Sequence, residues 1–265
     1  HAAIPHPGVV KKTRLISELV SSCPTEIIGL NLVVDTDEHH GLRFSLPRIE
    51  PGAVHLEEHR LVEQHGLALS AKVPDRSTLD EKITNVAATL AGTPFQSGAL
   101  SALSHLKEEA ETPLTPGFSR WLTRSYAPAR NLHQLALTRL CALPSIQKLF
   151  GEWCLDGIRL YDCYQRARDT IRERSHARSA AQPVPALRGS GDSYELPFWI
   201  IDHALGVRSP LFIRKEANGI TLISQGVTLG SVSNNGTIDC ASAFLAPRAL
   251  ITSMMLRVFV SDLFV

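Results

Sequence analysis

Acidic residues and histidines gather in one short stretch, residues 33–40 with the sequence VVDTDEHH. In an extended chain, positions two apart face the same side, so Asp35, Asp37 and His39 are expected to project together. Such a group can hold a ribose hydroxyl, an amine or a divalent ion, or accept a proton. We predict that these three side chains position the reacting groups of a substrate, without a resident metal. The alternative is a solvated exit from a strand.

A second candidate group lies near the N-terminus, where His6, Gly8 and Lys12 surround the expected start of a helix. A glycine at this place lets backbone N–H groups approach a phosphate, and the helix dipole and a lysine of the first turns favour negative charge. We predict that these three residues contact an anionic group. A proline-bounded loop, followed by a helix with solvated lysines, explains the same segment.

Arg248 follows Pro247 at another expected helix start and is predicted to bind a carboxylate or phosphate, although capping and surface roles fit equally. Asp202 and His203 could pair as carboxylate and imidazole, but a turn after a buried strand is the simpler interpretation. Arginines between positions 159 and 174 alternate with acidic residues, which is typical of a solvated helix face. The sequence holds no G-x-S-x-G or H-E-x-x-H motif.

The bulk composition is that of a globular protein, with 44% hydrophobic and 20% charged residues in 265. A net charge of +1 gives no overall field that would favour nucleic acid. No apolar run approaches the roughly 18 residues that a membrane span needs. Five scattered cysteines without a CxxC pair favour a reducing, cytoplasmic location. The chain starts without methionine and stops inside an apolar segment, so we expect a fragment of a longer protein.

The elements that must position these groups follow from the hydrophobic pattern. Residues 26–34 form a nearly continuous apolar run, which predicts a strand buried on both faces and therefore covered by helices. Residues 42–47 alternate as a second strand, and helices follow, one of them with capping boxes at Ser77 and Thr78. Strands return after Tyr194, with a hairpin signal at 217–219.

We therefore predict an α/β fold with a Rossmann-like, mostly parallel sheet that a helical insertion interrupts. Residues 1–54 would form the first part of the core, 55–190 the helical insertion and linker, and 191–265 the second part of the core. In such sheets ligands bind beyond the carboxyl ends of the strands, where Asp35 to His40 would lie. The sites at Gly8 and Asp37 are expected to converge there.

Three segments together resemble the bacillithiol synthase-like family: residues 6–12 (HPGVVKK), 33–39 (VVDTDEH), and 245–251 (LAPRALI) together with 257–259 (RVF). A group of uncharacterised bacterial proteins shares these blocks and also residues 195–199 (ELPFW). The blocks cover about a quarter of the chain. The order of acids and histidines differs from the family's, and the glycine-rich block that the family has later is absent.

The resemblance implies a Rossmann-like core and a ligase that joins cysteine to a glucosaminyl-malate acceptor. Because a shared fold does not carry a shared reaction, we transfer the expectation of a pocket for a small polar or nucleotide-like molecule more readily than the ligase reaction. No cofactor is indicated, and we expect no nucleic-acid or membrane partner. A homo-oligomer could form through the helical insertion. The alternatives are a non-catalytic scaffold that uses the arginine-bearing helix, or a different ligase or transferase.

Overall fold

The structure is a computed structural model, which describes residues 7–23, 27–36, 38–67, 72–126, 132–175, 184–202, 207–240 and 243–260. The chain divides into two compact units, unit 1 (His1–Leu137) and unit 2 (Thr138–Phe264), and each is described here by itself. Within the described ranges, the helices are too short or too polar to cross a membrane.

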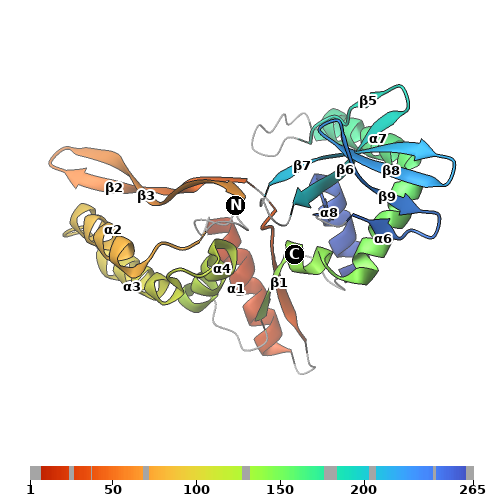
Figure 1. Ribbon diagram of the computed structural model, residues 1–265. Coiled ribbons are helices and arrows are strands. Elements are labelled where there is room, and N and C mark those ends of the chain that lie inside the picture. Colours follow the sequence, from red (N-terminus) through yellow and green to blue (C-terminus); the bar gives the residue numbers. More distant parts are fainter. Residues whose placement is uncertain are drawn as a thin grey trace. The chain divides into compact units, whose positions relative to one another are not determined.

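Unit 1 holds two separate two-stranded sheets. β1 and β4 pair in parallel, and α1 and α4 pack against them. β2 and β3 form a long antiparallel hairpin, which turns at Pro51-Gly52 and has α2 beside it (Figure 1). The elements are α1 (Pro7–Ser22), β1 (Gly29–Val33), β2 (Glu38–Glu50), β3 (Ala53–Leu67), α2 (Arg76–Thr89), α3 (Gln96–Leu106), the 3-10 helix Lys107–Glu109, α4 (Leu114–Tyr126) and β4 (Leu132–Ala136).

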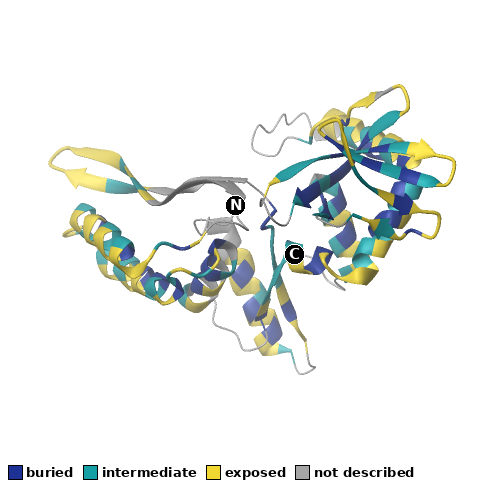
Figure 2. Cartoon of the chain, in the orientation of Figure 1, coloured by how far each residue is buried: buried dark blue, intermediate teal, exposed yellow. Residues whose placement is uncertain are grey.

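The core of unit 1 lies between α2, α3 and α4. Leu79 and Val86 are two turns apart on one face of α2, which is the spacing that brings apolar side chains together on a helix. They pack in one cluster with Leu106 of α3 and Phe118 of α4, and Leu46 of the hairpin covers the cluster. The turn of the hairpin is exposed (Figure 2), and α2 lies beside the strand residues that flank this turn.

Unit 2 is dominated by a seven-stranded sheet. Along its main path the order is β10-β9-β8-β7-β6-β11, every pair is antiparallel, and β5 pairs with β6. Its elements are α5 (Leu137–Cys141) at the boundary, α6 (Pro144–Leu155), α7 (Gly157–Ser175), β5 (Gly189–Ser190), β6 (Ser193–Asp202), β7 (Arg208–Glu216), β8 (Gly219–Ser224), β9 (Val227–Ser233), β10 (Ile238–Asp239), β11 (Ala243–Pro247), α8 (Ala249–Met255) and the π-helix Leu256–Val260.

Aromatic side chains join this sheet to α6. Phe150 of α6 and Phe198 of β6 are fully buried, with ring centroids 5.0 Å apart, and Trp153 lies 6.1 Å from Phe198. Such ring pairs add about 0.5–1.5 kcal/mol beyond the area that they bury. The aromatic contacts therefore fix α6 against β6, the strand next to the edge strand β11.

The predicted Rossmann-like, mostly parallel sheet is wrong. The large sheet is antiparallel, and the parallel sheet has only two strands, β1 and β4. In the large sheet, tight turns link β7 to β8 and β8 to β9. The first is at 217–218, as the hairpin signal predicts, and the second is at Gln225-Gly226, where both residues have positive φ. Such turns join antiparallel strands, whereas parallel neighbours need a crossover of about a dozen residues.

The strand expected at residues 26–34 is present but is not buried on both faces. β1 covers Gly29–Val33, only Gly29 is buried in it, and Leu30 is 43% exposed. Two segments expected to be helical also hold strands: β3 lies within 55–190 except for its first two residues, and β4 occupies the first half of the segment 131–141 that was expected to be one helix. In each case pairing with another strand, β2 for β3 and β1 for β4, outweighs the local helical preference of the segment.

The N-cap of α2 differs from the predicted capping boxes. Asp75 is the N-cap: its carboxylate accepts hydrogen bonds from the Ser77 hydroxyl at 2.6 Å and from the Thr78 backbone N–H at 2.9 Å. These bonds, led by that of Ser77, lower the pKa of Asp75 to about 2. Ser77 and Thr78 thus donate to the cap instead of forming it.

Replacing Asp75 by asparagine is expected to remove one pH-dependent contribution to stability. The folded pKa of about 2 lies below the ordinary value of 3.8, so ionised Asp75 stabilises α2 above pH 3.8 and loses this effect as pH falls toward 2. Melting temperatures of wild type and Asp75→Asn should therefore converge over this interval, whereas Asp75→Ala, which also loses the acceptor, should melt below both at neutral pH. A constant difference between wild type and Asp75→Asn at all pH values would contradict the assignment.

Candidate functional site

The predicted acidic cluster is only partly within the described residues. Asp35 and Thr36 lie in the turn after β1 and are buried, with 4% and 1% of their surface exposed. Asp37 lies outside the described residues, and His39 is described only as a backbone position on β2. The expected crevice at the carboxyl ends of several parallel strands does not exist here, because β1 has only β4 as a parallel neighbour.

The predicted anion-binding group at the N-terminus is also only partly within the described residues. α1 begins at Pro7, so Gly8 lies in its first turn, and Lys12 is exposed about one turn further on. His6 lies outside the described residues. The convergence of Gly8 and Asp37 on one ligand therefore stays a prediction.

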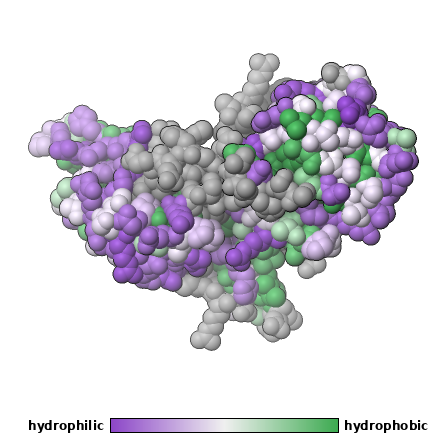
Figure 3. Space-filling view, in the orientation of Figure 1, coloured by the Kyte–Doolittle hydropathy of each residue, from purple (hydrophilic) through white to green (hydrophobic). Residues whose placement is uncertain are grey.

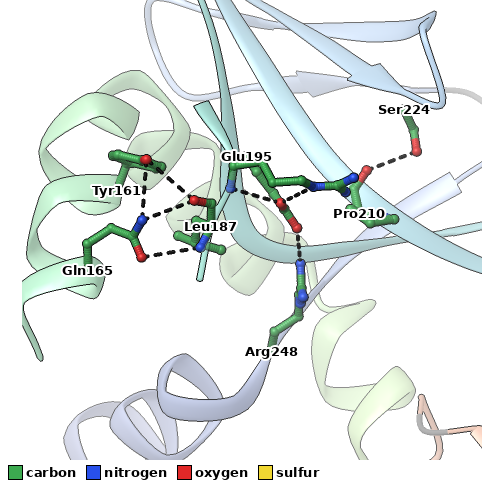
Figure 4. A network of polar contacts seen from close by, with 8 residues as sticks. Tyr161, Gln165, Leu187, Glu195, Pro210, Ser224 and Arg248 are labelled. Atoms are coloured by element: carbon green, nitrogen blue, oxygen red, sulfur yellow. Dashed lines mark hydrogen bonds and ion pairs between the residues drawn. The ribbon is translucent and has the colours of Figure 1, made fainter. Parts of the chain in front are cut away.

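Arg248 has a well-defined place in unit 2, immediately before α8. Its Nη1 donates to Oε1 of Glu195 at 2.6 Å (Figure 4). Arg188 donates from its Nε to Oε2 of the same carboxylate at 2.8 Å. Only 3% of the Glu195 side chain and 10% of the Arg248 side chain are exposed. The backbone N–H of Arg248 also donates to the carbonyl of Pro197 at 2.9 Å. These contacts fasten the start of α8 to β6.

The electrostatics of this ion pair favour the charged state. Burial opposes ionisation of Glu195, but the hydrogen bonds from Arg188 and Arg248 outweigh it and hold the pKa of Glu195 below its ordinary value. The guanidinium of Arg248 lies 4.0 Å from the ring centroid of Trp199, and that of Arg208 lies 4.4 Å from the same ring. Arg248 is thus held by a carboxylate and by an aromatic ring, which is a structural role.

A neighbouring amide extends the network toward α7. Gln165 donates to the carbonyl of Leu187 at 3.0 Å and accepts from the N–H of Leu187 at 3.2 Å, as an adjacent strand would (Figure 4). The hydroxyl of Tyr161 also contacts the Leu187 carbonyl, at 3.4 Å. The segment before β5 is thereby tied to the helix.

The structure does not join the remaining candidate residues, Asp202 with His203 and the arginines of α7, into a site within the described residues. Asp202 ends β6, and His203 lies outside the described residues. On α7, Arg159 pairs with Asp156 at 3.5 Å and Arg168 with Asp169 at 2.5 Å. The Arg159–Asp156 pair is exposed, as the prediction of a solvated helix face requires, whereas the side chain of Arg168 is only 12% exposed and does not fit that prediction.

A cavity of about 510 Å³ in unit 1 is the feature that sequence reasoning missed. It lies between the hairpin and α2, and we call it the His59 cavity. From the hairpin it is lined by Arg48, Glu57, Glu58, His59 and Arg60, and from α2 chiefly by Lys82, Asn85 and Thr89. Lys82, Asn85 and Thr89 are three to four residues apart and therefore share one face of the helix. Figure 3 shows mainly hydrophilic side chains over this part of unit 1.

Only 9% of the His59 side chain is exposed. The other ion-paired side chains described in the hairpin are all more exposed. Nε2 of His59 lies 3.1 Å from Oγ1 of Thr89, and that hydroxyl donates its single proton to the carbonyl of Asn85 at 3.1 Å. With that proton on the Asn85 carbonyl, the Thr89 oxygen accepts a hydrogen bond from Nε2 of His59. Glu57 lies 3.7 Å from the same Nε2, so these three residues do not form the relay of a catalytic triad, which uses both ring nitrogens.

The lining of the His59 cavity carries both signs of charge. Arg48 pairs with Glu57 at 3.5 Å and Arg60 with Glu58 at 2.9 Å, while Lys82 adds a third cation from α2. The signal in the sequence for this site is the turn dipeptide Pro51-Gly52, which follows the strand predicted at 42–47. In the described ranges, His, Cys, Asp and Glu side chains do not gather in groups of three that could hold a metal.

Comparisons with known proteins gave no matching family model and no matching curated protein. The resemblance to the bacillithiol synthase-like family therefore stays a prediction. The candidate site is defined by the geometry of the chain itself.

Proposed function

We propose that unit 1 binds a small polar molecule that carries both an acidic and a basic group, and that the His59 cavity is its site. The observation that carries the proposal is a cavity of about 510 Å³ whose lining combines three cations with two carboxylates. Pockets for small molecules usually measure about 300–1,000 Å³. The space exceeds that of a single amino acid and suits a sugar-sized compound.

The mixed charge determines what kind of molecule the cavity favours. A purely anionic ligand would gain from Lys82, Arg60 and Arg48 but would meet the carboxylates of Glu57 and Glu58. A purely cationic ligand would gain from the two carboxylates but would be repelled by the three cations. A molecule with both groups can replace the existing pairs of the lining, so that each charge keeps a partner of opposite sign.

Neutral polar groups would orient such a molecule. The imidazole of His59 is a hydrogen-bonding group of the lining, and the amide of Asn85 can both donate and accept. Hydroxyl groups of a sugar are suitable partners for both. The imidazole is held by Thr89 at 3.1 Å, so it is oriented before the ligand arrives.

The ligase reaction that the family resemblance implies is compatible with this proposal. An amino-sugar conjugate has an amine and acidic groups, which is the combination that the lining favours. The reaction itself, the cytoplasmic location and the homo-oligomer stay predictions. We rank binding above catalysis because the arrangement of Glu57, His59 and Thr89 is not that of a relay.

Calorimetric titration of the full chain with glucosamine 6-phosphate tests the charge requirement. Glucose 6-phosphate lacks the amine and glucosamine lacks the phosphate, so both serve as matched probes. We expect glucosamine 6-phosphate to bind at least about tenfold more tightly than either, which corresponds to about 1.4 kcal/mol. Equal affinities, or no binding by folded protein, would reject the proposal.

Replacing Lys82 by glutamine is expected to weaken binding of glucosamine 6-phosphate about tenfold or more, because a charged hydrogen bond contributes about 1.5–3 kcal/mol. Lys215→Gln, at an exposed position of β7, is the matched control and should leave the Kd unchanged. Lys12→Gln separates this site from the one predicted at the start of α1. Loss of binding in Lys12→Gln but not in Lys82→Gln would move the ligand to α1.

A further inference from the structure

We propose that unit 2 contains a second, independent site, for a small monoanion with an apolar body. The site is a cavity of about 480 Å³ between the first turns of α6 and the strands β10 and β11, which we call the α6 cavity. It shares no residue with the His59 cavity and does not depend on the function proposed for unit 1.

The lining of the α6 cavity is mostly uncharged. Apolar surface comes from Pro144 of α6, Ile238 of β10, and Ala243 and Phe244 of β11. Lys148 is the one charged side chain among the described residues that line it. An apolar lining with few polar groups is typical of small-molecule pockets. A single cation beside apolar surface selects one negative charge attached to a hydrocarbon or aromatic body.

Gln147 does not compete with Lys148 for this charge. Its Nε2 donates to the carbonyls of Cys141 at 2.7 Å and Leu245 at 2.9 Å, and its Oε1 accepts from the N–H of Leu245 at 3.3 Å. The amide is therefore used within the wall, where it fixes α6 to β11. The charge of a ligand would be met by Lys148, and the positive end of the α6 dipole acts in the same direction.

The opposite wall is held in place by a tight turn. The N–H of Thr237 donates to Oδ1 of Asn235 at 3.0 Å, and the carbonyl of Thr237 accepts from the N–H of Ser233 at 3.0 Å. Gly236 of the same turn has φ of +81° and packs directly on α6 at Gly151. Thr237 and Ile238 are thus positioned without a ligand, which lowers the entropic cost of binding.

Equilibrium titration of the full chain with 2-naphthoate tests the proposal, with 2-naphthalenemethanol as the uncharged probe of the same shape. We expect naphthoate to bind at least about tenfold more tightly than the alcohol. In Lys148→Gln the affinity for naphthoate should fall about tenfold, to that of the alcohol. Lys148 is exposed, so this variant is expected to fold, and Lys215→Gln is the matched control. Equal binding of acid and alcohol, an unchanged Kd in Lys148→Gln, or no binding would each overturn the proposal.

Cys240 gives a second measurement at the same place, because its half-buried thiol lines the cavity. In a variant with Cys23→Ser and Cys163→Ser, the remaining cysteines besides Cys240 are buried. Saturating naphthoate should slow labelling of Cys240 by a thiol reagent several-fold, and this protection should require Lys148. Labelling at an unchanged rate would place the ligand elsewhere and reject the α6 cavity. Lys82→Gln should leave the protection intact, which separates this test from that of the His59 cavity.

Discussion

Replacement of Glu195 by glutamine is expected to destabilise unit 2 by about 3–5 kcal/mol, because it leaves a buried guanidinium without its counter-charge. The carboxylate accepts from Arg248 at 2.6 Å and from Arg188 at 2.8 Å, and only 3% of its side chain is exposed. The amide that replaces it has one acceptor oxygen, and its NH₂ group would face an arginine. Urea unfolding, followed by the fluorescence of Trp153 and Trp199, measures the effect.

The matched control is Glu216→Gln at the end of β7. Glu216 also pairs with an arginine, Arg214, at 3.0 Å, but 49% of its side chain is exposed. Exposed ion pairs contribute about 0–1 kcal/mol. Equal losses in the two variants would show that burial of the Glu195 pair is not what makes it strong.

The effect of Glu195→Gln should depend on pH. Because the pKa of Glu195 is lower in the folded protein than its ordinary value of 4.5, its contribution is fully present above pH 4.5 and is lost as pH falls through the folded pKa. The difference in unfolding free energy between wild type and Glu195→Gln should thus be constant near neutral pH and shrink below pH 4.5. A difference that grows on acidification would mean that the carboxylate is not the stabilising form.

Gly151→Ala is expected to be the second severe substitution, with a loss of about 3 kcal/mol or more. A Cβ at this position in α6 would overlap the backbone carbonyl oxygen of Gly236 and would also crowd Ile238. Overpacking costs about 1–3 kcal/mol when side chains can move aside, and a backbone atom can move less. The same substitution should widen the gap between α6 and the turn that forms one wall of the α6 cavity. Denaturant unfolding measures the loss in stability.

Gly98→Ala is the control, and its expected change in stability is opposite in sign to that of Gly151→Ala. Gly98 lies in helix α3, is exposed, and a Cβ there would meet nothing within 4 Å. Alanine favours the helix over glycine by about 0.5–1 kcal/mol, so this variant should be slightly more stable than wild type. If both alanine variants change stability alike, the close contact between α6 and Gly236 is not a constraint.

The hairpin explains why the His59 cavity could not be predicted. Residues 42–47 were predicted as a strand, yet β2 begins at Glu38 and continues to Glu50. The charged segment that forms β3 has little apolar periodicity, and residues 53–60 of it, for which burial is described, are mostly exposed. Pairing with β2, and not local preference, makes it a strand. Once β3 was assigned to a helical region, Glu57, His59 and Arg60 could not be placed beside α2.

The sequence by itself determined the local elements: the strand after Tyr194, the hairpin at 217–219, and the helices that begin near Pro144 and after Pro247. These follow from periodicity and turn residues, which act within a few positions of the chain. Only the tertiary structure decided that the large sheet is antiparallel and that Glu195 meets Arg248, 53 residues away. Alternation along a strand indicates which face is buried but not which strand lies beside it. Partner and direction depend on how all the elements pack together, and the two cavities exist only as a result of that packing.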